Sequence, residues 1–263
     1  MPELPEVETI RREILPFVKG KVFSRLEIKD PRNIKGISPK KLEENLKGKK
    51  ILDIERRAKY LVFPLSPKGF LVVHLGMTGR LLFEPDPYLK ITFVFTGGKK
   101  LYFSDARLFG KVRFFDEDPK LDLGPEPFSK EFTPQRFKDM LMKKKTTIKL
   151  ALLDQKFLSG VGNIYANEAL FRAGIHPQRK TNSLSDKEAY KLHEVILAVL
   201  NEAINYRGTS DNWYVDASGK KGGFQNRLKV YGRKGEPCFK CKGKIVRISQ
   251  GQRGTFFCPA CQQ

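Results

Sequence analysis

The chain has 263 residues, of which 40% are hydrophobic and 20 are phenylalanine, so a sizeable core and two domains are expected. No apolar run reaches the roughly 18 residues of a membrane-spanning helix, and the acidic N-terminus is unlike a signal peptide. We therefore expect a cytoplasmic protein without a membrane partner. We also expect it to be a monomer. The net charge of +21 is spread along the chain. It favours nucleic acid as the partner, with an anionic membrane surface as the alternative.

The N-terminal sequence PELPEVE begins an amphipathic helix that we predict over residues 3–19. If Met1 is removed, Pro2 carries a free secondary amine, which attacks carbonyl-type carbons and gives a cationic iminium. Glu3 stands next to this amine and can move protons. The alternative is an ordinary first helical turn, in which Pro and Glu are both common.

The next hundred residues are expected to form an antiparallel sandwich of short strands. Their segments are rich in Val, Ile, Leu, Phe and Tyr and are bounded by Gly, Pro and Asp. Residues 96–99 are predicted to form a two-residue hairpin turn at Gly97-Gly98, and residues 39–46 a short helix. The predicted strands are 21–29, 50–56, 59–65, 69–75, 80–84, 89–96, 99–104 and 111–116.

A linker rich in Pro and acidic residues is expected over 118–133, after a first domain of residues 1–117. A helical domain is expected over 134–230 and a zinc finger over 231–263. The predicted helices are 134–144, 147–155, 163–173 and 185–206, the last beginning with a capping box. The polar, glycine-containing stretch 207–230 is too long for a plain connection, so it is either a functional lid or a disordered link.

All four cysteines fall in the last 26 residues, as Cys238-x2-Cys241 and Cys258-x2-Cys261. Two such knuckles about 16 residues apart can bring four thiolates together around one Zn²⁺. The residues between them alternate like a hairpin. Because sulfur fills every position, we expect this zinc to be structural rather than catalytic.

Three further clusters fit nucleic-acid binding. Gly160-Val161-Gly162-Asn163 would begin a helix whose N–H groups can hold a phosphate, with Lys149 nearby; the alternative is a plain helical hairpin. In Arg56-Arg57-Ala58-Lys59, Arg57 and Lys59 would share one strand face and reach phosphate, unless they are a solvated edge. Met77, Arg107 and Phe109 lie at strand ends and could wedge into a duplex, with core packing as the alternative.

Together these motifs resemble the bacterial formamidopyrimidine-DNA glycosylase family, also called 8-oxoguanine DNA glycosylase/AP lyase, over essentially the whole chain. They occur in family order: PELPEVE, RRAKYL, HLGM, DARLFG, GVGNIYANEAL, the Tyr231-Gly232-Arg233 run and the zinc finger. The resemblance implies a multidomain α+β fold. It has an N-terminal helix with an antiparallel β-sandwich, then a helical helix–two-turn–helix domain with a C-terminal zinc ribbon.

The resemblance also implies roles for single residues. Pro2 would attack C1′ of the damaged nucleotide, Glu3 would protonate the sugar ring oxygen, and Lys59 would act near the lesion phosphates. Residues 216–228 would close over the oxidised base. The implied DNA-binding residues are His74, Met77, Arg107, Phe109, Lys149, Asn163 and Arg253.

The implied function is base-excision repair at the bacterial nucleoid. The enzyme would remove 8-oxoguanine and formamidopyrimidines from duplex DNA and nick the strand by β,δ-elimination, with structural zinc as its one cofactor. An endonuclease VIII-type glycosylase for oxidised pyrimidines and a non-catalytic zinc-dependent DNA-binding protein are the alternatives. The chain departs from the family pattern at Leu108, where many members carry a second arginine.

Overall fold

The computed structural model describes residues 1–211 and 213–263 and divides the chain into two compact units. The first comprises Met1–Leu121 and Tyr206–Gln225, and the second comprises Asp122–Asn205 and Asn226–Gln263. Residues 206–225 were expected within the helical domain over 134–230. They belong to the first unit because long-range hydrogen bonds hold them to its first helix. No helix of the described chain is long and apolar enough to cross a membrane.

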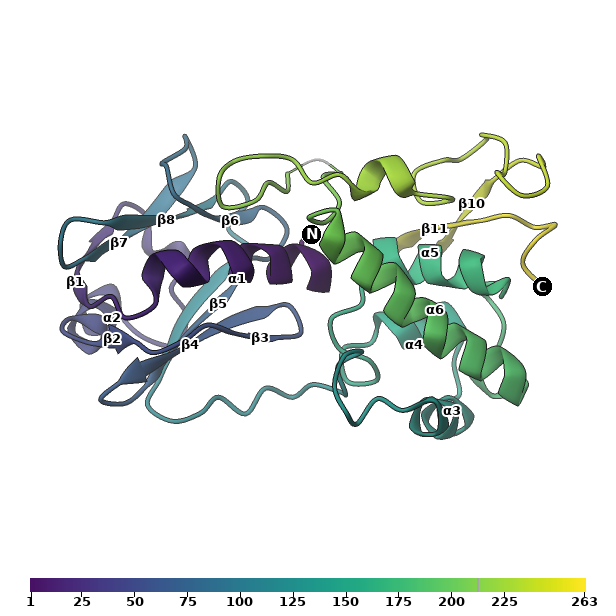
Figure 1. Cartoon of the computed structure of the whole chain (residues 1–263), viewed down its shortest axis with the longest axis horizontal. Coiled ribbons are helices and arrows are strands. Elements are labelled where there is room, and N and C mark those ends of the chain that lie inside the picture. Colours follow the sequence, from purple (N-terminus) through teal and green to yellow (C-terminus); the bar gives the residue numbers. More distant parts are fainter. Residues whose placement is uncertain (212) are drawn as a thin grey trace. The chain divides into compact units, whose positions relative to one another are not determined.

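The first unit is an antiparallel β-sandwich with one long helix, as expected (Figure 1). One sheet has the strand order β1-β7-β8-β6, and the other has the order β2-β4-β5-β9, with β3 also pairing with β4. The elements are α1 (Leu4–Val18), β1 (Phe23–Ile28), α2 (Pro39–Leu46), β2 (Lys50–Ile51), β3 (Glu55–Arg57), β4 (Tyr60–Ser66), β5 (Phe70–His74), β6 (Gly79–Leu82), β7 (Leu89–Phe95), β8 (Lys100–Asp105) and β9 (Lys111–Phe115).

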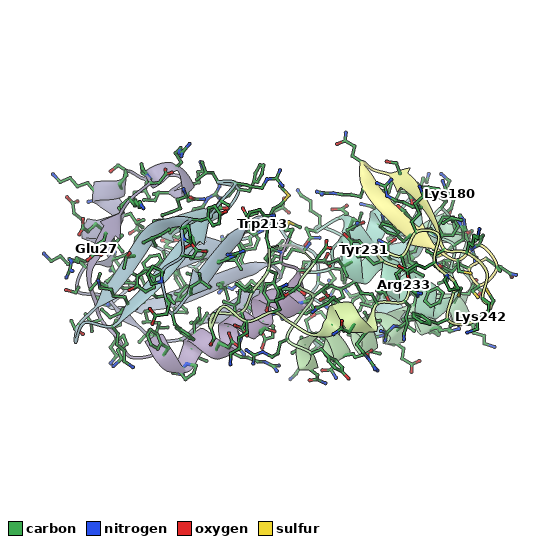
Figure 2. All side chains as sticks on the ribbon, turned by 90° about the horizontal axis from the view of Figure 1, so that it is seen from above. Glu27, Lys180, Trp213, Tyr231, Arg233 and Lys242 are labelled. Atoms are coloured by element: carbon green, nitrogen blue, oxygen red, sulfur yellow. The ribbon has the colours of Figure 1, made fainter. Side chains whose placement is uncertain are left out.

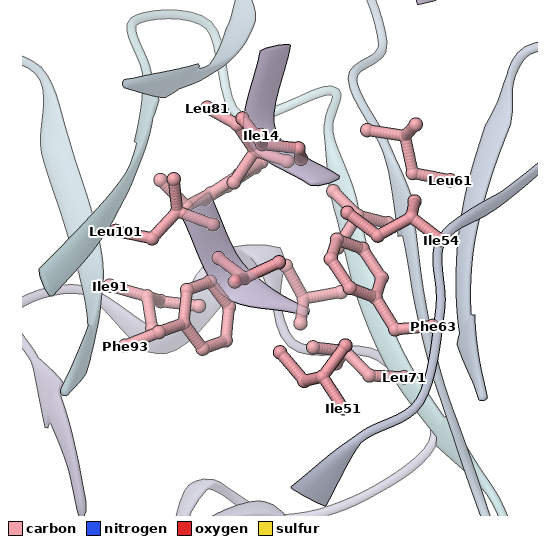
Figure 3. Close-up of a cluster of buried hydrophobic side chains, with 14 of the residues drawn as sticks. Ile14, Ile51, Ile54, Leu61, Phe63, Leu71, Leu81, Ile91, Phe93 and Leu101 are labelled. Atoms are coloured by element: carbon pink, nitrogen blue, oxygen red, sulfur yellow. The ribbon is translucent and has the colours of Figure 1, made fainter. Parts of the chain in front are cut away.

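The core of this unit lies between the two sheets and α1. Ile14 of α1 is fully buried in a cluster with Phe93 and Leu101 from one sheet and Phe63 and Leu71 from the other (Figure 3). Each such side chain stabilises the folded state by about 1.5–3 kcal/mol through the apolar area it removes from water. The apolar stripe of α1 therefore fixes the helix on the sandwich, and with it the position of the N-terminus.

Two local predictions were wrong in detail. The strand expected over 50–56 is two strands, because Ile51 pairs with Leu65 but Glu55 pairs with Val62. Between these two pairs, residues 52–54 lie opposite residues 63–64 of β4. The one extra residue is the mark of a β-bulge. The hairpin after β7 is confirmed, but its turn has three residues, because the N–H of Phe95 donates to the carbonyl of Lys99 at 2.9 Å.

The second unit consists of helices and one hairpin, and its four long helices agree with the predicted ones to within two residues at each end. The capping box of the last helix is confirmed, since the N–H of Ser185 donates to Glu188 at 2.8 Å. The elements are α3 (Pro134–Lys143), α4 (Ile148–Leu153), α5 (Asn163–Ala173), α6 (Asp186–Asn205), β10 (Val246–Gln250) and β11 (Arg253–Phe257). Short 3₁₀ turns cover Pro31–Asn33 in the first unit, Thr181–Ser183 in the second, and Phe224–Arg227 where the chain passes from the first unit to the second.

Candidate functional site

The chain begins at the N-terminal end of α1, where Pro2 and Glu3 are buried and Met1 is 49% exposed. Glu6, in the first turn, organises this end. One of its carboxylate oxygens accepts the N–H of Glu3 and the other accepts the N–H of Thr209, both at 2.7 Å. A carboxylate in this position also complements the helix dipole. Glu6 therefore fixes the backbone that presents the nucleophile expected at Pro2, a role that our sequence analysis did not assign.

Lys59 lies in a tight turn rather than on a strand. Arg57 and Tyr60 pair across the hairpin, so Ala58 and Lys59 are its two turn residues, and Ala58 has a φ of 55°. Arg57 and Lys59 therefore do not share a strand face, contrary to our expectation. Arg57 forms ion pairs with Glu55 and Asp118, whereas Lys59 is only 6% exposed.

His74, at the end of β5, lies opposite Tyr60 on one side and Lys111 on the other. Burial lowers the pKa of His74 to about 4, and the nearby charges of Lys59, Lys111 and Arg113 act in the same direction. The ring is therefore neutral at physiological pH. Its Nδ1 accepts the N–H of Gly76 at 3.2 Å, so Nε2 carries the proton. His74 is thus available as a hydrogen-bond donor but not as a cation.

The two turns that carry Met77, Arg107 and Phe109 are held together by a buried carboxylate. Asp105 has no exposed surface and accepts hydrogen bonds from Asn33 Nδ2 at 2.8 Å, the Gly110 N–H at 2.7 Å and the Arg107 N–H at 3.2 Å. It also accepts the hydroxyl of Thr78 at 2.5 Å. The Asp105 carboxylate therefore holds together Asn33, Thr78 and the turn of residues 105–110. Sequence reasoning missed Asp105, although it opens the DARLFG motif.

The same two turns meet backbone to backbone. Gly76 has a φ of +62°, and a Cβ there would lie 2.5 Å from the carbonyl carbon of Phe109. This close approach keeps Met77 and Phe109 in neighbouring turns. Phe109 is 48% exposed, and the guanidinium carbon of Arg107 lies 5.1 Å from the centre of its ring. An exposed apolar ring beside a cation, on a rigid base, suits insertion into a duplex better than core packing.

In the second unit, the start of α5 contacts the tip of the β10–β11 hairpin. Asn163 donates through Nδ2 to the carbonyl of Gly254 at 3.1 Å, and Asn167 accepts the N–H of Phe256 at 2.7 Å. Arg253, exposed at the tip, is thereby placed beside the helix N-terminus. The structure thus brings together Asn163 and Arg253, two of the residues predicted to bind DNA.

Lys149 is buried beneath the β10–β11 hairpin. It was expected among the residues that contact DNA, but it has no exposed surface. Its ammonium group donates to the carbonyl of Gly254 at 3.1 Å and to the hydroxyl of Thr255 at 2.6 Å. A buried ammonium needs such partners. In this structure Lys149 therefore supports the hairpin that carries Arg253.

Glu168 is a second buried carboxylate that the sequence analysis missed. It has no exposed surface and accepts the N–H groups of Lys229, Val230 and Tyr231 at 2.9 to 3.0 Å. Burial raises the pKa of Glu168, and these N–H groups act in the opposite direction. The carboxylate ties α5 to the start of the Tyr231–Arg233 motif, whose end residues are labelled in Figure 2. No local pattern marks this role.

The four cysteine sulfurs lie within 4.8 Å of one another, with Cys238–Cys261 at 3.9 Å and Cys241–Cys258 at 3.4 Å. Tetrahedral zinc with Zn–S bonds of about 2.3 Å places its sulfurs about 3.8 Å apart. The cluster therefore fits one zinc ion with no open position, as predicted. When bound, the ion supplies a cross-link between the two knuckles, not chemistry.

Residues 206–225 are held against α1. Glu13 of this helix forms an ion pair with Arg207 and accepts the N–H of Ala217 at 2.7 Å. Asp216, with no exposed surface, also pairs with Arg207 at 2.5 Å. The described residues of this stretch are therefore ordered on the first unit, and the alternative of a disordered link does not apply to them.

Three family models match the chain. They describe the formamidopyrimidine-DNA glycosylase N-terminal domain over residues 1–112, the H2TH domain of the same enzymes over 123–214, and a zinc finger found in FPG and IleRS over 235–263. Similar relatives named formamidopyrimidine-DNA glycosylase come from Carboxydothermus hydrogenoformans, at 44% identity, and Heliobacterium modesticaldum, at 41%. In both cases the match covers the whole of both chains.

Solved structures agree with these matches. The MutM (Fpg) protein from Thermus thermophilus is 41% identical, with a TM-score of 0.91 over 99% of this chain and 98% of that one. A complex of Lactococcus lactis Fpg with DNA containing an abasic site is 37% identical, with a TM-score of 0.91 over 99% of each chain. Wild-type L. lactis Fpg bound to DNA containing N7-benzyl-Fapy-dG gives the same identity and TM-score over both whole chains.

Proposed function

Because the chain belongs to the formamidopyrimidine-DNA glycosylase family, we propose that it excises oxidised purines from duplex DNA and then cuts the strand at the abasic site. The substrates are 8-oxoguanine and formamidopyrimidines. The observation that carries the proposal is the N-terminus, where the buried Pro2 precedes the buried Glu3, whose N–H is held by Glu6.

The reaction begins once Met1 has been removed, because only then is the Pro2 nitrogen an amine. Its lone pair forms a bond to C1′ while the glycosidic bond breaks. The base leaves with the electrons of the glycosidic bond and takes up the proton that the Pro2 nitrogen loses. Glu3 donates a proton to the sugar ring oxygen, the ring opens and an iminium forms between Pro2 and C1′. The iminium draws electrons from C2′, so loss of a C2′ proton expels the 3′ phosphate, and a second elimination expels the 5′ phosphate.

We assign the remaining site residues to holding the DNA. Lys59, in the turn before β4, and the Nε2–H of His74, on the neighbouring β5, contact phosphates at the lesion, and Asn163 and Arg253 hold the flanking phosphates. Met77, Arg107 and Phe109 fill the space that the everted nucleotide leaves. Exposure of Arg107 and Phe109 supports this role, and so does their anchoring on Asp105. Lys149 is left out of the contact set because it is buried.

We further propose that the protein acts as a monomer in the bacterial cytoplasm, bound at the nucleoid. Its relatives are bacterial and the charge of +21 favours DNA at low salt. Light scattering during gel filtration at working concentration tests the first point. A dimer mass would contradict it.

The decisive experiment is borohydride trapping on a duplex with 8-oxoguanine opposite cytosine, preceded by a mass measurement that verifies Met1 removal. We expect a covalent protein–DNA adduct. It should be lost from a form with an uncleaved N-terminal extension, which keeps every side chain but turns the amine into an amide. Pro2→Gly, which carries a primary amine instead, should trap far less. An adduct that survives the extension would contradict the role of Pro2.

The two alternatives give different results in the same assay. An endonuclease VIII-type enzyme would trap on thymine glycol in preference to 8-oxoguanine. A non-catalytic binding protein would bind both duplexes with a strong salt dependence and trap on neither.

A further inference from the structure

The one tryptophan of the chain, Trp213, is labelled in Figure 2. It belongs to an aromatic and basic cluster at the surface of the first unit, together with Tyr88 and Arg80. Trp213 is 37% exposed and Tyr88 is 40% exposed. Their rings meet edge to face with centroids 5.7 Å apart, and the guanidinium carbon of Arg80 lies 5.7 Å from the indole centre. Two large aromatic rings exposed side by side indicate a binding surface rather than chance exposure.

Polar contacts build this cluster. Arg80 donates through Nε to the carbonyl of Trp213 at 2.9 Å and pairs with Asp86 at 3.1 Å. Asp86 in turn accepts the N–H of Tyr88 at 2.8 Å. The Asp86 carboxylate therefore holds both residues that contact the indole, Arg80 and Tyr88. These bonds hold the backbone of Trp213 and of Tyr88, so fewer groups have to be ordered when a ligand binds, which favours affinity.

The cluster is connected to both parts of the candidate site in the first unit. The carbonyl of Tyr88 accepts the N–H of Asp105 at 3.0 Å, and Asp105 anchors the turns of Met77 and Phe109. On the other side, the segment that carries Trp213 begins at Thr209, which is bound to Glu6 at the N-terminus. Trp213 thus lies on a segment joining the nucleophile's helix to the anchor of the inserted residues.

We propose that Trp213 stacks on the base of the everted nucleotide and that Arg80 and Tyr88 hold the indole in place for it. The inference rests on the function proposed above and names a recognition residue for it. An everted base has lost its stacking neighbours, and an aromatic ring replaces one of them whatever the base. A bicyclic purine covers more of an indole than a pyrimidine does. The platform therefore favours the bicyclic 8-oxoguanine over oxidised pyrimidines.

Because Trp213 is the one tryptophan, intrinsic fluorescence reports on it directly. The wild-type protein is titrated with three duplexes: one with a carbocyclic 8-oxoguanine nucleotide that cannot be cleaved, one with a tetrahydrofuran abasic analogue and one undamaged. We expect the first to quench the tryptophan and shield it from acrylamide, and the other two to change it much less. Equal changes with the first two duplexes would overturn the proposal, because the abasic analogue has no base to stack.

Kinetics give the second test. Trp213→Ala should lower kcat/KM for 8-oxoguanine release by about tenfold, within the range for loss of one base–aromatic stack, while Trp213→Phe keeps most of it. Cutting at a ready-made abasic site should stay unchanged in both variants. The matched control is Tyr190→Ala, since Tyr190 is equally exposed at 38% but lies on α6.

The possible results distinguish the stacking role of Trp213 from the proposed glycosylase function. Full 8-oxoguanine excision by Trp213→Ala would overturn the stacking role while leaving the glycosylase assignment intact. An equal loss at 8-oxoguanine and at abasic sites would also overturn it, because the residue would then act on general DNA binding. If the wild-type protein cuts abasic sites but releases no oxidised purine, both the stacking role and the glycosylase function would be contradicted.

Discussion

Removing the carboxylate of Asp105 should test how the inserted residues are held. This side chain has no exposed surface and accepts four hydrogen bonds, from Asn33, Thr78, Arg107 and Gly110. In Asp105→Ala, Asn33 keeps a second acceptor in the carbonyl of Gly110 at 2.9 Å, and Arg107 keeps the hydroxyl of Thr78 at 3.0 Å.

The loss of stability in Asp105→Ala depends on which hydrogen-bond donors no longer have an acceptor. The N–H of Gly110 loses the acceptor found in the structure, and each hydrogen bond to a charged group contributes about 1.5–3 kcal/mol. Two of the four donors keep alternatives, whereas the Gly110 N–H and the Thr78 hydroxyl lose the acceptor they have here, so we expect the free energy of unfolding to fall by about 3–6 kcal/mol. Asp105→Asn keeps one acceptor oxygen and should cost roughly half as much.

The assay is urea denaturation followed by steady-state excision of 8-oxoguanine under conditions where each variant is folded. Displacement of the two turns by even about 1 Å should lower kcat/KM by roughly a hundredfold. Asp116→Ala, an exposed aspartate of the same unit, is the control. If Asp105→Ala matched this control in both stability and excision, the anchoring role would be refuted.

Two further predictions concern His74 and the zinc site. The folded-state pKa of His74, about 4, lies below its ordinary value of 6.5, so only the unfolded chain takes up this proton as the pH falls between those values. The free energy of unfolding should therefore decline by up to about 3 kcal/mol from near pH 6.5 to near pH 4 and stay level below pH 4. His74→Gln should remove that part of the decline. Urea titrations at stepped pH measure it. A variant with the wild-type slope would show that other groups cause it. Cys258→Ser should lose zinc, measured by metal analysis, and DNA affinity, measured by fluorescence anisotropy, because the β10–β11 hairpin depends on the cross-link. Trp213 fluorescence should stay unchanged, since it reports on the first unit, and full DNA binding by this variant would contradict the role of the finger.

Local patterns were enough for much of this protein. The apolar period of 3.6 located α1, α3, α5 and α6 because amphipathic helices carry their burial signal in nearby residues. The spacing of the two CxxC knuckles was enough for zinc, since ligand type and spacing nearly define that site. The alternation of Gly243–Phe257 predicted the hairpin between them. In each case the determining contacts join residues close in sequence.

Tertiary structure decided what depends on partners far away in the chain. Lys149 looks like any basic residue near a glycine turn, and its burial follows from a bond to Gly254, 105 residues away. Asp105 acquires its role from Asn33, 72 residues away, and Glu6 from Thr209, 203 residues away. A buried charge is stable only where donors from several segments converge, and no local pattern encodes that convergence. The roles of Glu6, Asp105 and Lys149 could therefore be assigned only from the tertiary structure.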